Sequence, residues 1–192
     1  MDKSAITIIS GLPRSGTSLM MQMLQAGGMP LLTDGVRKPD ADNPRGYWEF
    51  EPVKNTGRDP SWLRGARGRA VKMVYRLLYD LPRNHQYNII LMRRDLREIL
   101  ASQEIMLRRT GRHEGGSPGE MATAFESEIR TFDAWIEGCQ EFSILRVSYG
   151  DLVEHPLRES RHVDRFLGGG LNLAAMAEAV DPSLHRNKRN KG

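Results

Sequence analysis

The sequence of 192 residues contains a single cysteine, Cys139. One thiol cannot form an intramolecular disulfide, and it leaves most zinc-binding patterns without their ligands. No apolar run approaches the ~18 residues that span a bilayer, and the N-terminus lacks the basic start and cleavage site of a secretory signal. We therefore expect a chain without a membrane span or a structural metal, in a cytoplasmic location.

Aromatic residues are also scarce, and the excess of charge is small. Aromatics make up 7% of the chain, and 28 Lys and Arg against 24 Asp and Glu give a net charge of +4. The basic side chains are mostly Arg, which suits bidentate contacts with phosphate or sulfate. Aromatics do not interleave the basic runs as they do in proteins that bind single-stranded nucleic acid. The composition favours a small anionic ligand over nucleic acid, in one domain spanning residues 1–192.

A lysine is missing from the most informative stretch, a glycine loop at residues 11–18. A β-branched apolar run precedes it, and apolar residues at helical spacing follow it. Gly11 and Gly16 have the spacing of a Walker A loop, GxxxxGK[ST], but Thr17 stands where that motif has lysine, and Arg14 is the only cation. Strand, glycine loop and helix together present N–H groups and a helix dipole to an anion. An ordinary glycine turn is the alternative for this loop taken alone.

Strands and helices alternate along the rest of the chain. Apolar patterns predict three further strands, at 70–75, 87–93 and 142–147, and helices near 95–109, 118–136, 156–167 and 172–180. Asp95 and Glu98 form a capping-box pattern. The pattern predicts a three-layer α/β/α fold with a central parallel sheet of four to five strands, like that of P-loop NTPases. Residues 33–70 have weak periodicity and are interpreted as a cap over the site, with short helices near 51–56 and 60–65.

In such a sheet, ligands bind at the carboxyl ends of the strands. The glycine loop lies at one of these ends, and Tyr75, Arg94 and Tyr149 lie at the others. Arg94 and Ser102 are eight residues apart, at the strand exit and on the following helix, so they can hold one phosphate from two sides. We therefore expect one anion site that draws on several strands.

Three separate motifs resemble those of one enzyme family. Pro13-Arg14-Ser15-Gly16-Thr17-Ser18 resembles the 5′-phosphosulfate loop of sulfotransferases that use 3′-phosphoadenosine 5′-phosphosulfate (PAPS). The spacing from Arg94 to Ser102 is similar to the family's 3′-phosphate motif. Residues 146–152 are similar to the strand-turn-helix in which a tyrosine, here Tyr149, lies near the adenosine. The chain is identified as a member of the sulfotransferase family by this resemblance.

The resemblance implies a metal-independent, in-line transfer of a sulfuryl group from PAPS to a hydroxyl or amine. The acceptor is a small molecule or a carbohydrate. Arg14 and the N–H groups of residues 15–18 would bind the transferring group, and the Thr17 and Ser18 hydroxyls would hold its oxygens. Lys72 would stabilise the bridging oxygen that leaves. Arg186, Lys188 and Arg189, in the basic tail at 184–192, match a basic loop that contacts the 3′-phosphate in relatives.

The general base is the point at which the sequence departs from the cytosolic members. They keep a Lys-Thr-His pattern after the second strand, whereas this chain has Lys72-Met73-Val74 and no histidine there. Other sulfotransferases use a glutamate from the segment after the glycine loop, which makes Glu49 the candidate. Glu51 and His85 remain alternatives.

Two other functions compete with this interpretation. A P-loop kinase would need a Walker lysine and a magnesium-binding acid after an apolar strand, but the third strand ends in Arg93-Arg94 and Asp95 suits a helix cap. A non-catalytic nucleotide-binding module would fit the basic charge. It would not explain three site motifs in the family's order.

Overall fold

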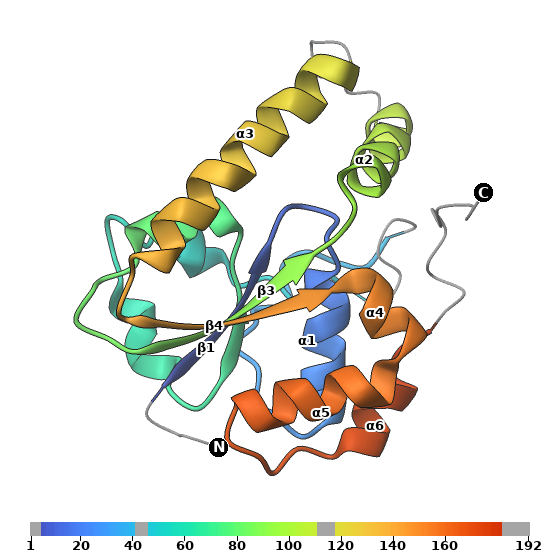
Figure 1. Ribbon diagram of the computed structural model, residues 1–192. Helices are drawn as coiled ribbons and strands as arrows, with labels where there is room; N and C mark the ends of the chain where they lie inside the picture. Colours follow the sequence, from blue (N-terminus) through green and yellow to red (C-terminus); the bar gives the residue numbers. More distant parts are fainter. Residues whose placement is uncertain (1–4, 41–45, 111–117, 182–192) are drawn as a thin grey trace.

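The computed structural model describes residues 5–40, 46–110 and 118–181 (Figure 1). Its sheet has four parallel strands in the order β2-β1-β3-β4. They are β1 (Ile6–Gly11), β2 (Ala70–Lys72), β3 (Tyr87–Arg93) and β4 (Phe142–Ser148). An isolated parallel bridge between Leu31 and Ala70 extends the sheet beyond β2. The predicted α/β fold with a parallel sheet is confirmed, and all four carboxyl ends lie at one edge.

Helices cover both faces of the sheet because alternate strand residues are apolar on both sides. Ile8 and Ile89 belong to one buried cluster and Ile9 and Ile90 to the other. The first face packs on α3 (Pro118–Glu137) and on three short 3₁₀ helices, η1 (Glu51–Asn55), η2 (Ser61–Gly65) and η3 (Tyr75–Asp80). The second packs on α1 (Thr17–Ala26), α4 (Tyr149–Glu154), α5 (Pro156–Phe166) and α6 (Leu173–Glu178). Helix α2 (Leu96–Thr110) follows β3 and extends past the sheet beside α3 (Figure 1).

The second strand is shorter than predicted. It ends at Lys72, although the Met73 N–H still donates to the Ile9 carbonyl, and η3 begins at Tyr75. Tyr75 and Leu78 are both buried, and the Tyr75 ring packs edge-on against Phe132 of α3, with 5.3 Å between ring centroids. Residues three apart face the same way in a 3₁₀ turn, so this helix buries an apolar pair that a strand would splay apart.

Helix α4 was not predicted, because Ser148 and Tyr149 were interpreted as a strand end and a turn. The Ser148 side chain accepts from the Asp151 N–H at 3.3 Å and so caps a helix that begins directly at Tyr149. The short helices expected near 51–56 and 60–65 are present as η1 and η2. Within the described residues, no helix has the length and apolarity needed to cross a membrane.

Candidate functional site

The glycine loop turns directly into α1 and leaves the start of that helix open. Gly16 is its N-cap, with a φ of 101°, and no side chain caps the helix or places an acid in its first turn. Arg14 also has a positive φ, of 69°. The first N–H groups of a helix have no partner within it, and the helix dipole makes this end positive. The loop therefore has the geometry of an anion site.

The two arginines singled out in the sequence are tied to each other through this loop. The Arg14 Nε–H donates to the Ser102 hydroxyl of α2 at 2.9 Å, over a sequence separation of 88 residues. In the other direction, Arg94 donates from Nη1 to the Arg14 carbonyl at 3.1 Å. Arg14, Arg94 and Ser102, drawn from two motifs, thus lie side by side at the carboxyl ends of β1 and β3.

Tyr149, at the end of the neighbouring strand β4, packs against this cluster. The Arg94 guanidinium carbon lies 4.3 Å from the centroid of the Tyr149 ring, within the range of a cation–π contact. The same ring packs so closely on the loop that a Cβ added at Gly16 would lie 2.4 Å from its Cδ2. Burial raises the pKa of the Tyr149 hydroxyl. Tyr149 therefore lies against the loop as a neutral ring.

A second cluster gathers around Lys72, at the end of β2. Its ammonium donates to the Tyr47 carbonyl and lies 3.5 Å from the Ser18 hydroxyl and 3.6 Å from Glu49 Oε1. The Lys72 side chain is only 14% exposed. Burial lowers its pKa to about 8, although the neighbouring Glu49 opposes this shift.

The structure separates the three candidates for the base. Glu49 pairs with Arg37 at 2.9 Å, with Lys72 at 3.6 Å and with Lys54 at 3.9 Å. Glu51 pairs with Lys54, and its side chain is 44% exposed. His85 hydrogen-bonds Asn84 and precedes β3, so it lies at the amino end of the sheet, away from the loop. Glu49 is the one that contacts Lys72.

Residues 30–40 and 46–51 place Glu49 beside Lys72 through contacts that the sequence did not reveal. Leu32 donates to the Ala70 carbonyl at the sheet edge, and the Asp34 carboxylate accepts from the Glu51 N–H at 2.6 Å. Arg37 stacks on the Tyr47 ring, with 3.3 Å between its guanidinium carbon and the ring centroid. The Tyr47 hydroxyl bonds the Asp40 carboxylate at 2.7 Å. Arg37 and the Tyr47 carbonyl are functional candidates without a motif, because only the fold of these residues brings them to Lys72.

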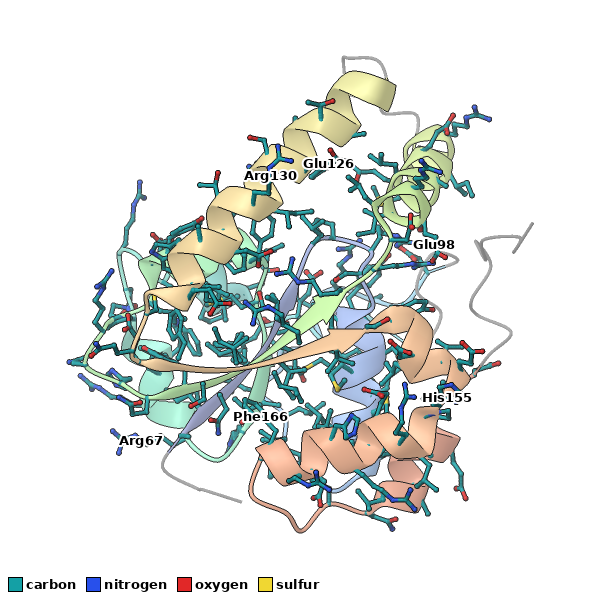
Figure 2. The ribbon with its side chains drawn as sticks, viewed as in Figure 1. Arg67, Glu98, Glu126, Arg130, His155 and Phe166 are labelled. Carbon is teal, nitrogen blue, oxygen red and sulfur yellow. The ribbon has the colours of Figure 1, made fainter. Side chains whose placement is uncertain are left out.

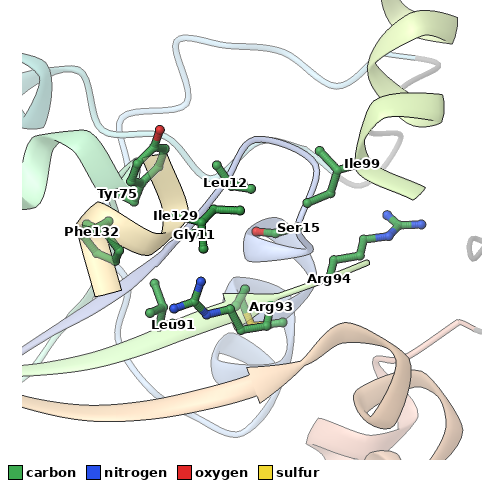
Figure 3. A pocket seen from close by; sticks show the side chains of 11 residues that line it. Gly11, Leu12, Ser15, Tyr75, Leu91, Arg93, Arg94, Ile99, Ile129 and Phe132 are labelled. Atoms are coloured by element: carbon green, nitrogen blue, oxygen red, sulfur yellow. The ribbon is translucent and has the colours of Figure 1, made fainter. Parts of the chain in front are cut away.

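A narrow apolar pocket opens on the α3 side of the loop (Figure 3). It is lined by Gly11, Leu12, Ser15, Tyr75, Leu91, Met92, Arg93, Arg94, Ile99, Ile129 and Phe132. The Ser15 hydroxyl is buried and has no hydrogen-bond partner among the described residues. Figure 3 shows the Arg94 guanidinium directed away from Tyr75 and Phe132. The lining is therefore mostly apolar, but it also includes Tyr75, Arg93, Arg94 and the unpaired Ser15 hydroxyl.

The remaining site candidates have simpler positions. Pro13 is exposed at the tip of the loop, and Thr17 and Ser18 form the first turn of α1. Arg186, Lys188 and Arg189 lie outside the described residues.

Comparisons with known proteins agree on the fold. No protein-family model matches the sequence, and no curated protein matches it. Among solved structures, the sulfotransferase domain from the curacin biosynthetic pathway superposes with a TM-score of 0.53 at 16% identity, over 98% of this chain and 93% of that one. Mouse sulfotransferase SULT7A1, solved in complex with PAP, superposes with a TM-score of 0.54 at 16% identity, over 100% of this chain and 68% of that one. The chain therefore has the fold of the sulfotransferases.

Proposed function

We propose that the protein is a PAPS-dependent sulfotransferase that transfers a sulfuryl group to a hydroxyl or amine without a metal. The observation that carries the proposal is the convergence of Arg14, Arg94, Ser102 and Tyr149 on a glycine loop whose helix N-terminus is uncapped. The fold is that of the sulfotransferases, and SULT7A1 was solved with PAP, the desulfated product of PAPS.

The residues present suit such a nucleotide. The N–H groups at the start of α1 suit the 5′-phosphosulfate, and Arg94 with Ser102 suits the 3′-phosphate. The Tyr149 ring, beside Arg94 and Gly16, offers a flat surface for the adenosine. Positive charge at the loop comes from side chains of the chain itself, so the proposed site needs no cation from solution.

In this proposal Glu49 is the general base, and Lys72 stabilises the charge on the leaving oxygen. PAPS would supply the electrophilic sulfur and the bisphosphate leaving group. Glu49 takes the proton of the acceptor hydroxyl as the new oxygen–sulfur bond forms. The Lys72 ammonium, 3.6 Å from Glu49, stabilises negative charge on the bridging oxygen as the old sulfur–oxygen bond breaks. Glu49 gives up part of its ion pairing with Arg37 or Lys54 when it accepts the proton.

The test is acceptor-dependent release of PAP from PAPS in a buffer containing EDTA. A panel of apolar alcohols, phenols and sugars would be incubated with the protein, with product followed by chromatography. We expect PAP release with at least one of these acceptors and no release by the Lys72→Met variant. Release of ADP from ATP and magnesium with the same acceptors, without release of PAP from PAPS, would favour a kinase instead.

A further inference from the structure

The carboxylate of Glu98 lies at the proposed 3′-phosphate site, where the sequence suggested only a helix cap. Asp95 fills the capping role, since its Oδ1 accepts from the Arg97 N–H at 2.8 Å. Glu98 Oε2 instead accepts from Arg94 Nε at 2.9 Å. Figure 2 shows Glu98 at the base of α2, near the end of β3. Glu98 therefore contacts the arginine that is proposed to bind the 3′-phosphate.

The pair is largely shielded from water and is fixed from three sides. The Arg94 and Glu98 side chains are 9% and 15% exposed. Arg94 Nε bonds Glu98 on α2, Nη1 bonds the Arg14 carbonyl in the loop, and the guanidinium lies over Tyr149 of α4. Three elements thus restrain one flexible side chain in a single orientation.

The hydrogen bonds leave part of the guanidinium available. Arginine has five N–H donors, and these two bonds use one on Nε and one on Nη1. Among the described residues, no other group bonds the second N–H of Nη1 or the two of Nη2, which suit a ligand. A phosphate takes two parallel bonds from arginine, so the edge that faces it must be held in place beforehand. Glu98 occupies the Nε end and so determines which edge is presented.

We propose that Glu98 is a positioning residue for the 3′-phosphate, acting through Arg94. This inference rests on the proposed function and adds a residue that no motif identified. Its carboxylate does not touch the nucleotide. It holds the guanidinium so that the Nη groups meet the 3′-phosphate without first losing rotamer freedom, and this raises the affinity for nucleotides that carry that phosphate.

Binding of PAP and of AMP, which lacks the 3′-phosphate, to Glu98 variants tests the inference by calorimetry. Glu98→Gln keeps an oxygen that accepts from Arg94 Nε, whereas Glu98→Ala removes it. We expect Glu98→Ala to bind PAP about tenfold more weakly with AMP affinity unchanged, and Glu98→Gln to retain most PAP affinity. Glu104→Ala is the matched control, because it breaks an exposed pair with Arg108 on the same helix and should change neither affinity.

Other outcomes would overturn the inference. Tighter PAP binding by Glu98→Ala would mean that the carboxylate competes with the phosphate for Arg94. Equal losses for PAP and AMP, or no rescue by Glu98→Gln, would mean a structural role only.

A second measurement separates this inference from the proposed function. The Arg94 Nε–H signal in a ¹H–¹⁵N spectrum of the free protein reports the bond to Glu98 without any nucleotide. We expect slow solvent exchange of this proton in the wild type and Glu98→Gln, and fast exchange in Glu98→Ala. Unchanged exchange in Glu98→Ala would refute positioning by Glu98. A wild type that binds AMP as tightly as PAP would instead refute the proposed nucleotide.

Discussion

Lys72 carries a charge in a largely buried position. Its ammonium is buried between the Tyr47 carbonyl, Ser18 and Glu49, and burial lowers its pKa to about 8. The charged form still predominates at pH 7, as the proposed mechanism requires. Holding that charge in a buried position costs stability, so function and stability oppose each other at this residue.

We expect Lys72→Met to be more stable than the wild type at pH 7, by up to about 3 kcal/mol. The reason is that the folded pKa of about 8 lies below the unfolded value of 10.5. The unfolded wild type therefore binds more protons between these values, and its stability rises with pH across this range. The loss of folding free energy from burying the Lys72 charge is fully present below pH 8 and absent above about 10.5. Urea unfolding of both proteins from pH 7 to 10.5 measures the difference, and a difference independent of pH would contradict this account.

Glu49→Gln should lower turnover roughly 10²–10⁴-fold while PAP binding is preserved. The substitution keeps the size of the side chain but removes the proposed base beside Lys72. Glu51→Gln is the control and should lower turnover less, because Glu51 pairs with Lys54 near the surface. The check is a comparison of turnover with a competent acceptor, alongside PAP affinity. Near-normal turnover in Glu49→Gln would show that another group accepts the proton.

Sequence motifs predicted part of this site because its residues lie close together in the chain. The spacing from Arg94 to Ser102 follows from one helix that begins at the end of one strand, and the loop is contiguous. The Tyr47 carbonyl bonds Lys72, and Arg37 pairs with Glu49 beside it, through contacts of residues 30–40 and 46–51 that no motif marks. Glu98 matched a capping pattern, and its bond to Arg94 could not be predicted because the position of that arginine depends on Tyr149 and the loop.

At the scale of elements, the glycine loop and α4 form one packed unit. The loop approaches Tyr149 so closely that Gly16 has no room for a side chain, and its φ of 101° is unfavourable for other residues. Gly28, at the end of α1, has a similar φ of 90° but open space around it. Comparing Gly16 with Gly28 therefore separates the energetic cost of backbone strain from the cost of contact with the Tyr149 ring.

Gly28→Ala should cost about 1 kcal/mol of folding free energy, from backbone strain alone. Gly16→Ala should cost more and also weaken PAP binding, because the new methyl group displaces Tyr149. Urea unfolding and calorimetry measure the two effects. Equal stability losses, with PAP affinity intact in both variants, would show that the loop and Tyr149 are not coupled.

Element boundaries were predicted where local signals were strong. The strand at 87–93 matches β3 because it is a continuous apolar run. The strand predicted at 70–75 is wrong at its end. In η3, Tyr75 and Leu78 are both buried and Tyr75 packs on Phe132 of α3, which an extended edge strand would not allow. Helix α4 was missed because six residues are too few to show a helical period.

At the scale of the molecule, the parallel sheet brings distant motifs together. β1 ends in the loop, β2 in Lys72, and β3 and β4 lead into Arg94 and Tyr149. Alternating strands and helices were enough to predict this shared edge. The sequence could not predict the pocket beside the loop, because its lining comes from the loop, β3, η3, α2 and α3 together.

Calorimetric titration with nucleotides tests the central claim, that this edge is a metal-free site for a 3′-phosphorylated adenosine nucleotide. The wild-type protein would be titrated in EDTA with PAP and with AMP, and in magnesium with ATP. We expect PAP to bind without metal and at least about tenfold more tightly than AMP, because charged hydrogen bonds from Arg94 and Ser102 contribute about 1.5–3 kcal/mol each. Tighter binding of ATP with magnesium than of PAP, or equal affinity for AMP and PAP, would contradict the account.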